Sequence, residues 1–246
     1  MTDPVDERRA ELAEALAAVR GRIAAACASA HRSPDEVELL AVTKTRPATD
    51  AALLLELGLC AFGENRVQEA TGKVAELDRL RPGNGARWHL VGRLQRNKAR
   101  PVAAWAARVE SVDSVRLADA LDGAARRAVQ GGERSAPLPV LVQVSLDDDP
   151  ARGGVPPSGL DELADRVAAA AGLRLDGLMA VAPLGAEPAR AFADLARLAE
   201  RLRSRHPDAR VLSAGMTADM DEAIRCGSTC VRVGTALLGE RRLASP

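Results

Sequence analysis

Short apolar runs alternate with amphipathic stretches along the chain, and this alternation limits the possible folds more than any other feature of the sequence. The apolar runs are predicted to be strands and cover residues 38–43, 60–63, 88–91, 108–112, 139–145, 174–180, 210–213 and 230–233. The stretches between them have helical periodicity and cover residues 47–57, 64–78, 95–106, 114–130, 158–171, 187–205 and 217–226. Regular alternation of strands and helices is typical of a parallel sheet.

We expect this sheet to close into a single (β/α)₈ TIM barrel. Eight strand–helix units in 246 residues fit that fold, because strands this short and apolar need helices over their whole outer surface. An open doubly wound sheet is the alternative. It would need a glycine-rich turn after the first strand, where the chain has Lys44-Thr45-Arg46-Pro47 instead. No linker or fixed repeat divides the chain, so residues 1–246 are predicted to form one domain.

The first 30 residues are predicted to add an amphipathic helix that packs on this barrel. Asp3 fits an N-cap, and Pro4 fits the first helical position. Apolar residues then recur on one helical face, at Leu12, Leu16, Val19 and Ile23.

The overall composition argues against several classes of protein. Lys plus Arg and Asp plus Glu both number 34, so the chain lacks the basic excess of a nucleic-acid-binding protein. No apolar run approaches the ~20 residues that span a bilayer, and the first residues do not resemble a signal peptide. The four cysteines have no metal-binding spacing and are predicted to be buried free thiols. We expect a cytoplasmic monomer with no metal, nucleic-acid or membrane partner.

Lysine is rare in this chain, and one lysine stands where chemistry is expected. Only positions 44, 73 and 98 carry it, and Lys44 follows the first strand. A primary amine can form a Schiff base with a carbonyl, whereas arginine stays charged and is not a nucleophile. The alternative is an ordinary strand-end lysine whose amine reaches solvent.

Two turns near the end of the chain are candidates for binding a phosphate. In a barrel the functional face lies where strands end and the following loops begin. The seventh strand ends in Ser213-Ala214-Gly215-Met216-Thr217, and the eighth ends in Arg232-Val233-Gly234-Thr235. Thr217, Gly234 and Thr235 would open helices there and bring donors to an anion. Such residues also make ordinary helix caps.

Three features of this face suit an aldehyde that carries a phosphate. They are the amine after the first strand, the phosphate site after the seventh and eighth strands, and Arg232. Pyridoxal 5'-phosphate (PLP) fits this description, with Lys44 forming the Schiff base and Arg232 facing the pyridine nitrogen. Because guanidinium is permanently cationic, it would disfavour a protonated ring nitrogen and weaken the ring as an electron sink.

Six ordered segments of the sequence resemble a known family. They are Ala41-Val42-Thr43-Lys44-Thr45-Arg46-Pro47, Phe62-Gly63-Glu64-Asn65, His89-Leu90-Val91-Gly92 with Leu94-Gln95 and Asn97-Lys98, Gly177-Leu178-Met179, Leu212-Ser213-Ala214-Gly215-Met216-Thr217, and Val231-Arg232-Val233-Gly234-Thr235. The chain resembles the pyridoxal phosphate homeostasis protein family from about residue 37 to 241. Two departures are Arg66, where the family usually has an aromatic residue, and Thr217 in place of serine, which keeps the hydroxyl.

The resemblance implies a barrel of the alanine racemase N-terminal type, with Lys44 as the Schiff-base lysine and Arg232 as the ring-nitrogen partner. It places Ser213, Gly215, Thr217, Gly234 and Thr235 around the phosphate, and we add Asn65 and Met216 to the predicted cofactor-binding residues. No catalytic residue is assigned.

Three functions remain open at this point. The favoured one is a carrier that buffers PLP or delivers it to apo enzymes that depend on it. The second is a PLP enzyme such as a weakly active amino-acid racemase. The third is a barrel enzyme that acts on a phosphosugar through a lysine Schiff base. Racemisation needs acid–base groups on both faces of the substrate, and the two-domain racemases use a tyrosine and a second domain. This chain contains no tyrosine.

Three further residues have two interpretations each. His89 could reach the cofactor or make a buried hydrogen bond. Glu64 could polarise a substrate or interact with a helix dipole. Lys98 lies on a helix face that is either solvated or able to accept a phosphate.

Overall fold

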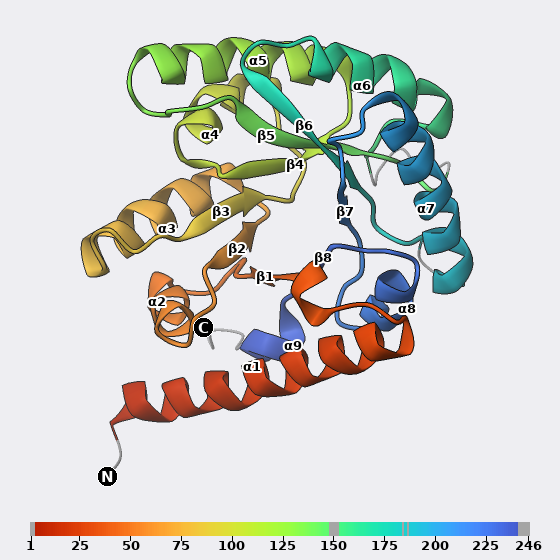
Figure 1. Ribbon diagram of the computed structural model, residues 1–246. Coiled ribbons are helices and arrows are strands. Elements are labelled where there is room, and N and C mark those ends of the chain that lie inside the picture. The colour runs from red at the N-terminus through yellow and green to blue at the C-terminus, as the bar shows by residue number, and fades with distance from the viewer. Residues whose placement is uncertain (1–2, 148–152, 184, 186, 241–246) are drawn as a thin grey trace.

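A computed structural model describes residues 3–147, 153–183, 185 and 187–240. Its eight parallel strands close into a barrel in sequence order, as predicted, and helices surround them (Figure 1). The strands are β1 (Glu38–Val42), β2 (Ala61–Glu64), β3 (Arg87–Leu90), β4 (Arg108–Val112), β5 (Leu138–Gln143), β6 (Leu173–Met179), β7 (Val211–Ser213) and β8 (Cys230–Val233). The barrel closes where β1 pairs with β8, and Leu40 there lies opposite Arg232.

The helices lie close to their predicted positions. They are α1 (Pro4–Ser29), α2 (Ala48–Glu56), α3 (Val67–Leu80), α4 (Ala99–Trp105), α5 (Val115–Gln130), α6 (Leu160–Ala168), α7 (Pro188–Arg205), α8 (Met220–Arg225) and α9 (Thr235–Leu238), with 3₁₀ turns η1 (Pro34–Glu36), η2 (Arg96–Lys98) and η4 (Pro157–Gly159).

Two predicted helix starts are wrong, and each has a local cause. The helix expected from residue 64 begins at Val67, because Glu64 still belongs to β2 and pairs with Leu90. The helix expected from residue 217 begins at Met220, because Asp219 accepts a hydrogen bond from the Met216 N–H at 2.6 Å and closes a turn first.

The glycine at position 177 allows β6 to pass close to β7. Its φ is +151°, and a Cβ there would lie 1.8 Å from the carbonyl oxygen of Val211. The pairing register between β5 and β6 shifts at the same level, between Val140 and Leu141. Any side chain at this position would force the two strands apart, so the residue is needed for barrel closure.

Helix α1 packs along α8 and α9, as Figure 1 shows at the lower edge of the barrel. The Asp3 side chain accepts from the Val5 N–H at 2.9 Å, which confirms the predicted N-cap. Leu12, Leu16 and Ile23 are almost completely buried, and each contributes ~1.5–3 kcal/mol from burial. Arg22 adds a hydrogen bond to the Thr217 carbonyl and two to the Asp221 carboxylate. The N-terminal helix thus supports the turn that follows β7.

The cysteines are all free thiols, but only Cys27 and Cys230 are buried, whereas Cys60 and Cys226 are partly exposed. Among the described residues no cluster of His, Cys, Asp and Glu could hold a metal ion. Within the same part of the chain, no helix is long and apolar enough to cross a membrane.

Candidate functional site

A pocket of about 410 Å³ opens where the strands end and their following loops begin. This size lies in the usual range for small-molecule sites. Seven of the nine predicted site residues line it: Lys44, Asn65, Met216, Thr217, Arg232, Gly234 and Thr235. The structure therefore brings together residues at or just after the ends of β1, β2, β7 and β8 that lie up to 191 positions apart.

The pocket is positively charged. Lys44, Arg46 and Arg232 contribute cations, and none of the described residues that line the pocket is an Asp or Glu. Hydroxyl groups of Thr217 and Thr235 and the amide of Asn65 complete the polar lining. Such a donor set matches an anionic ligand with a carbonyl that an amine can attack.

Lys44 is exposed and lies two residues after the end of β1. The backbone on both sides of it is fixed by hydrogen bonds. Before it, the Thr43 N–H donates to the Gly63 carbonyl at 3.0 Å. After it, Thr45 takes a left-handed conformation with φ 64°, and its N–H donates to the Glu69 carboxylate. The amine therefore projects from a backbone that is fixed on both sides. The left-handed conformation of Thr45 costs ~1 kcal/mol or more, because threonine is β-branched.

A buried ion pair between Glu64 and Lys73 supports the backbone next to Lys44. The Glu64 carboxylate accepts from Lys73 Nζ at 2.5 Å and from the Thr43 hydroxyl at 2.6 Å. Lys73 also donates to the Thr43 carbonyl at 2.7 Å and to Glu69 at 3.2 Å. Burial raises the pKa of Glu64, and the hydrogen bonds from Lys73 and Thr43 offset part of that rise. We call Thr43, Glu64, Glu69 and Lys73 the Lys73 cluster.

The Lys73 cluster changes the interpretation of two residues. An ammonium has three donors, and all three of Lys73 are used by Thr43, Glu64 and Glu69, so this buried amine is not free to react. Glu64 does not line the pocket and does not open a helix, so both interpretations offered for it are wrong. Its role is to neutralise Lys73 and hold Thr43.

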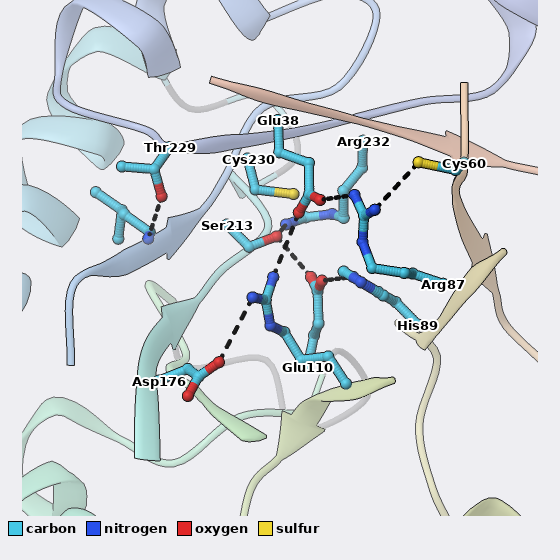
Figure 2. Close-up of polar contacts among 12 residues, drawn as sticks. Glu38, Cys60, Arg87, His89, Glu110, Asp176, Ser213, Thr229, Cys230 and Arg232 are labelled. Atoms are coloured by element: carbon cyan, nitrogen blue, oxygen red, sulfur yellow. Dashed lines mark hydrogen bonds and ion pairs between the residues drawn. The ribbon is translucent and has the colours of Figure 1, made fainter. Parts of the chain in front are cut away.

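A second buried network fixes Arg232 (Figure 2). The guanidinium donates to the Ser213 hydroxyl at 2.7 Å. It also donates to the Ala180 carbonyl at 2.7 Å. Ser213 in turn donates to Glu110 at 2.6 Å, and the other Glu110 oxygen lies 2.8 Å from His89 Nδ1. The prediction that His89 makes a buried hydrogen bond is confirmed.

Glu110 balances the charge of Arg232 inside the barrel. Its burial would raise its pKa, but the hydrogen bond with His89, together with the charge of Arg232, holds the pKa of Glu110 below its ordinary value. The carboxylate is therefore ionised at neutral pH. Arg232 is held at both of its terminal nitrogens, so its position is fixed before any ligand binds.

Ser213 and Gly215 do not line the pocket. The Ser213 hydroxyl is used by Glu110 and Arg232. Gly215 has φ +91°, and a Cβ there would lie 2.6 Å from the Ala223 Cβ, so only glycine fits the turn. Its carbonyl accepts from the Arg232 N–H at 2.9 Å. The structure places both residues behind the wall of the pocket, where they support Arg232.

The two phosphate turns differ from each other. Gly234 caps α9 and Thr235 begins it, as expected for a turn that opens a helix. Thr217 lies three residues before α8, so no helix N-terminus lies at its N–H. The Met216 N–H is already used by Asp219. The sequence predicted that Thr217, Gly234 and Thr235 would open helices and bring donors to an anion. Among these, only Gly234 and Thr235 lie at the start of a helix.

Other pocket residues were not predicted from the sequence. The Arg46 guanidinium donates to the carbonyls of Gly239 and Glu240 and so closes one side of the pocket. Val91 and Val181 lie just after β3 and β6, where a barrel predicts functional residues. That rule could have found them. The partners of Lys73 and Arg232 carry no comparable signal, since they depend on contacts between distant strands.

The fold and the pocket define a barrel of the alanine racemase N-terminal type, and residues 15–242 match the family described as the alanine racemase N-terminal domain. A protein of Mycobacterium tuberculosis named pyridoxal phosphate homeostasis protein is 49% identical over 249 residues, which cover 98% of this chain and 96% of that relative. The chain belongs to the pyridoxal phosphate homeostasis protein family.

Solved structures agree with this assignment. PipY of Synechococcus elongatus, a structure with PLP bound, is 35% identical with a TM-score of 0.78, and the match covers 93% of this chain and all of PipY (100%). Alanine racemase of Corynebacterium glutamicum is 16% identical with a TM-score of 0.65, and the match covers 97% of this chain and 62% of that one. At that identity the second likeness shows the fold alone.

Proposed function

We propose that this protein binds pyridoxal 5'-phosphate and buffers or delivers it, without substantial turnover of its own. The observation that carries the proposal is one cationic pocket that contains both the exposed Lys44 amine and the fixed guanidinium of Arg232. Membership in a family whose relatives are named for PLP homeostasis supports it. PipY, which has been solved with PLP bound, supports the choice of cofactor.

The residues present suit this cofactor. Lys44 would hold it covalently through its amine, and Arg232 would face the ring nitrogen. Thr217, Gly234 and Thr235 would bind the phosphate, with Asn65 and Met216 beside it. Ser213 and Gly215 belong to the site as supports of Arg232. When bound, PLP supplies a reactive aldehyde and an electron-accepting ring. Arg232 keeps its charge and so disfavours a proton on the ring nitrogen.

Several features favour a carrier over an enzyme. The chain has no tyrosine to serve as an acid or base, and we propose that residues 1–246 form a single barrel domain. Lys44 alone could move a proton on one face, so weak racemase-like activity is the alternative, favoured by the shared fold. No carboxylate among the described residues lines the pocket, which argues against a phosphosugar lyase.

The carrier function predicts transfer without turnover. The protein loaded with PLP should reactivate an apo enzyme that depends on PLP, and we propose such apo enzymes as its partners in the cytoplasm. Incubation with a panel of L-amino acids should give no D-enantiomer by chiral chromatography. Turnover on the order of 1 per second or more on any panel member would favour the enzyme instead.

The phosphate is expected to dominate affinity. Thr217, Gly234 and Thr235 offer donors to a dianion, and each hydrogen bond to a charged group contributes ~1.5–3 kcal/mol. Pyridoxal without the phosphate should therefore bind about a hundredfold more weakly or worse, as measured by calorimetry. A Thr235→Val variant should lose part of the preference for PLP over pyridoxal. Equal affinities for the two compounds would mean that these turns do not bind phosphate.

A further inference from the structure

A second and larger cavity, of about 1150 Å³, lies beside the cofactor pocket. Four basic residues line it: Arg93, Arg96 and Lys98 on the segment after β3, and Arg116 in the first turn of α5. We call this cavity the basic cleft. It contains the Asn97-Lys98 motif, to which the proposed function gives no role.

The cations of the basic cleft have no partner within the part of the chain that the structure describes. Among the residues that the structure describes, none of the side chains of Arg93, Arg96, Lys98 and Arg116 makes a hydrogen bond or ion pair, whereas other arginines such as Arg22 and Arg8 are paired with carboxylates. Four like charges at one cavity repel each other, and a bound anion would offset that repulsion.

The polar lining of the cleft also suits an anion. Asp113 is the one carboxylate among its described residues, and it already accepts from the Ser114 hydroxyl at 3.2 Å. Gln95 and Asn97 add neutral donors. Arginine side chains bind phosphate groups through two parallel hydrogen bonds. Because the cations come from two elements, the segment after β3 and the start of α5, a ligand with more than one charged group would contact both.

The cleft and the cofactor pocket are separate cavities that share a wall. Asn65 and Val91 line the pocket, whereas Val67 and Arg93 line the cleft. Between them Gly92 is so close to Asn65 that a Cβ would lie 2.2 Å from its carbonyl oxygen. A ligand of the cleft therefore occupies a site of its own and does not extend the cofactor pocket through this wall.

We propose that the basic cleft is a binding site for a small molecule that carries two or more phosphate groups. The cleft is larger than a single phosphate needs, and it is open to solvent on the face of the barrel where the cofactor pocket opens. The proposal does not depend on the cofactor function, because none of its four cations lines the cofactor pocket.

Calorimetry with inorganic pyrophosphate and with ADP tests the proposal. We expect both to bind the wild-type protein, and the affinity to fall as NaCl is raised from 50 to 500 mM, since exposed charges are screened. In the double variant Arg96→Glu/Arg116→Glu the affinity should fall at least about tenfold. A matched control is Arg190→Glu, an exposed arginine on α7, which should leave the affinity unchanged.

Each other outcome overturns the proposal. Pyrophosphate that binds the double variant as well as wild type occupies another site, such as the phosphate turns of the cofactor pocket. No binding at millimolar pyrophosphate or ADP means that the cleft takes no phosphate ligand. If a poly-glutamate peptide binds in a cleft-dependent way and the phosphates do not, the surface instead docks an acidic protein. Circular dichroism and PLP binding of the Arg96→Glu/Arg116→Glu variant separate these results from misfolding.

Discussion

Replacing Lys44 by alanine is expected to abolish covalent attachment of PLP. Lys44 is the exposed amine in the cofactor pocket. Lys73 is buried with its three donors occupied, and Lys98 lies in the basic cleft across the wall at Gly92. A Lys44→Arg variant keeps the charge but cannot form the Schiff base. It should retain some phosphate-dependent affinity and no covalent adduct.

The measurement is borohydride reduction of the loaded protein followed by peptide mass mapping. In wild type the reduced adduct should be found on Lys44, and the visible absorbance of the bound cofactor should be lost on reduction. Lys98→Ala is the matched control and should label as wild type does. An adduct mapped to Lys73 or Lys98 in the wild-type protein would contradict the assignment of Lys44.

The fold was predictable because the signals that define it are local. Each strand is a short apolar run, and the order of strands around the barrel follows their order in the chain. Lys44 and Arg232 could be placed on one face because both lie at strand ends, and a barrel brings all such ends together. The N-cap at Asp3 also depends on neighbours alone.

The parts of the site that were missed depend on contacts between distant residues. Glu64 and Lys73 form an ion pair across β2 and α3, and nothing in their sequence neighbourhood shows that both would be buried. The resemblance placed Ser213 at the phosphate, but its hydroxyl donates to Glu110, 103 residues away. Only the packed barrel decides which side of a strand end faces the pocket.

The Lys73 cluster predicts the largest effect on stability. In a Lys73→Met variant the Glu64 carboxylate, with 0% of its side chain exposed, would lose its counter-ion. Removing one partner of a buried pair typically destabilises by ~3–5 kcal/mol. Urea unfolding at pH 8 should show a loss of this size. Arg225→Ala, which removes an exposed pair with Glu222, is a control and should change the unfolding free energy by less than ~1 kcal/mol.

The pH dependence of this loss separates a charge effect from a packing effect. Burial already raises the pKa of Glu64 above its ordinary 4.5, and without Lys73 the hydrogen bond and charge that lower it disappear. The pKa of Glu64 in the folded variant should therefore rise further. Between 4.5 and that higher pKa, the folded variant binds a proton that the unfolded chain has released, so its stability falls as pH rises. The deficit against wild type should be small near pH 5 and full at pH 8.

A double variant with Lys73→Met and Glu64→Leu tests whether the unpaired charge of Glu64 causes the loss of stability. It removes both charges, so it should recover most of the stability lost at pH 8 and should lose the pH dependence. The Thr43 hydroxyl would lose its partner Glu64, and the Thr43 carbonyl would keep only the Arg46 N–H. The Lys44 segment would then be held by the Thr43 and Arg46 N–H groups and by Glu69. We therefore expect the double variant to fold but to form the covalent adduct at Lys44 more slowly. If the single variant is equally destabilised at pH 5 and pH 8, Lys73 stabilises the loop by packing, and its charge is not what holds Glu64.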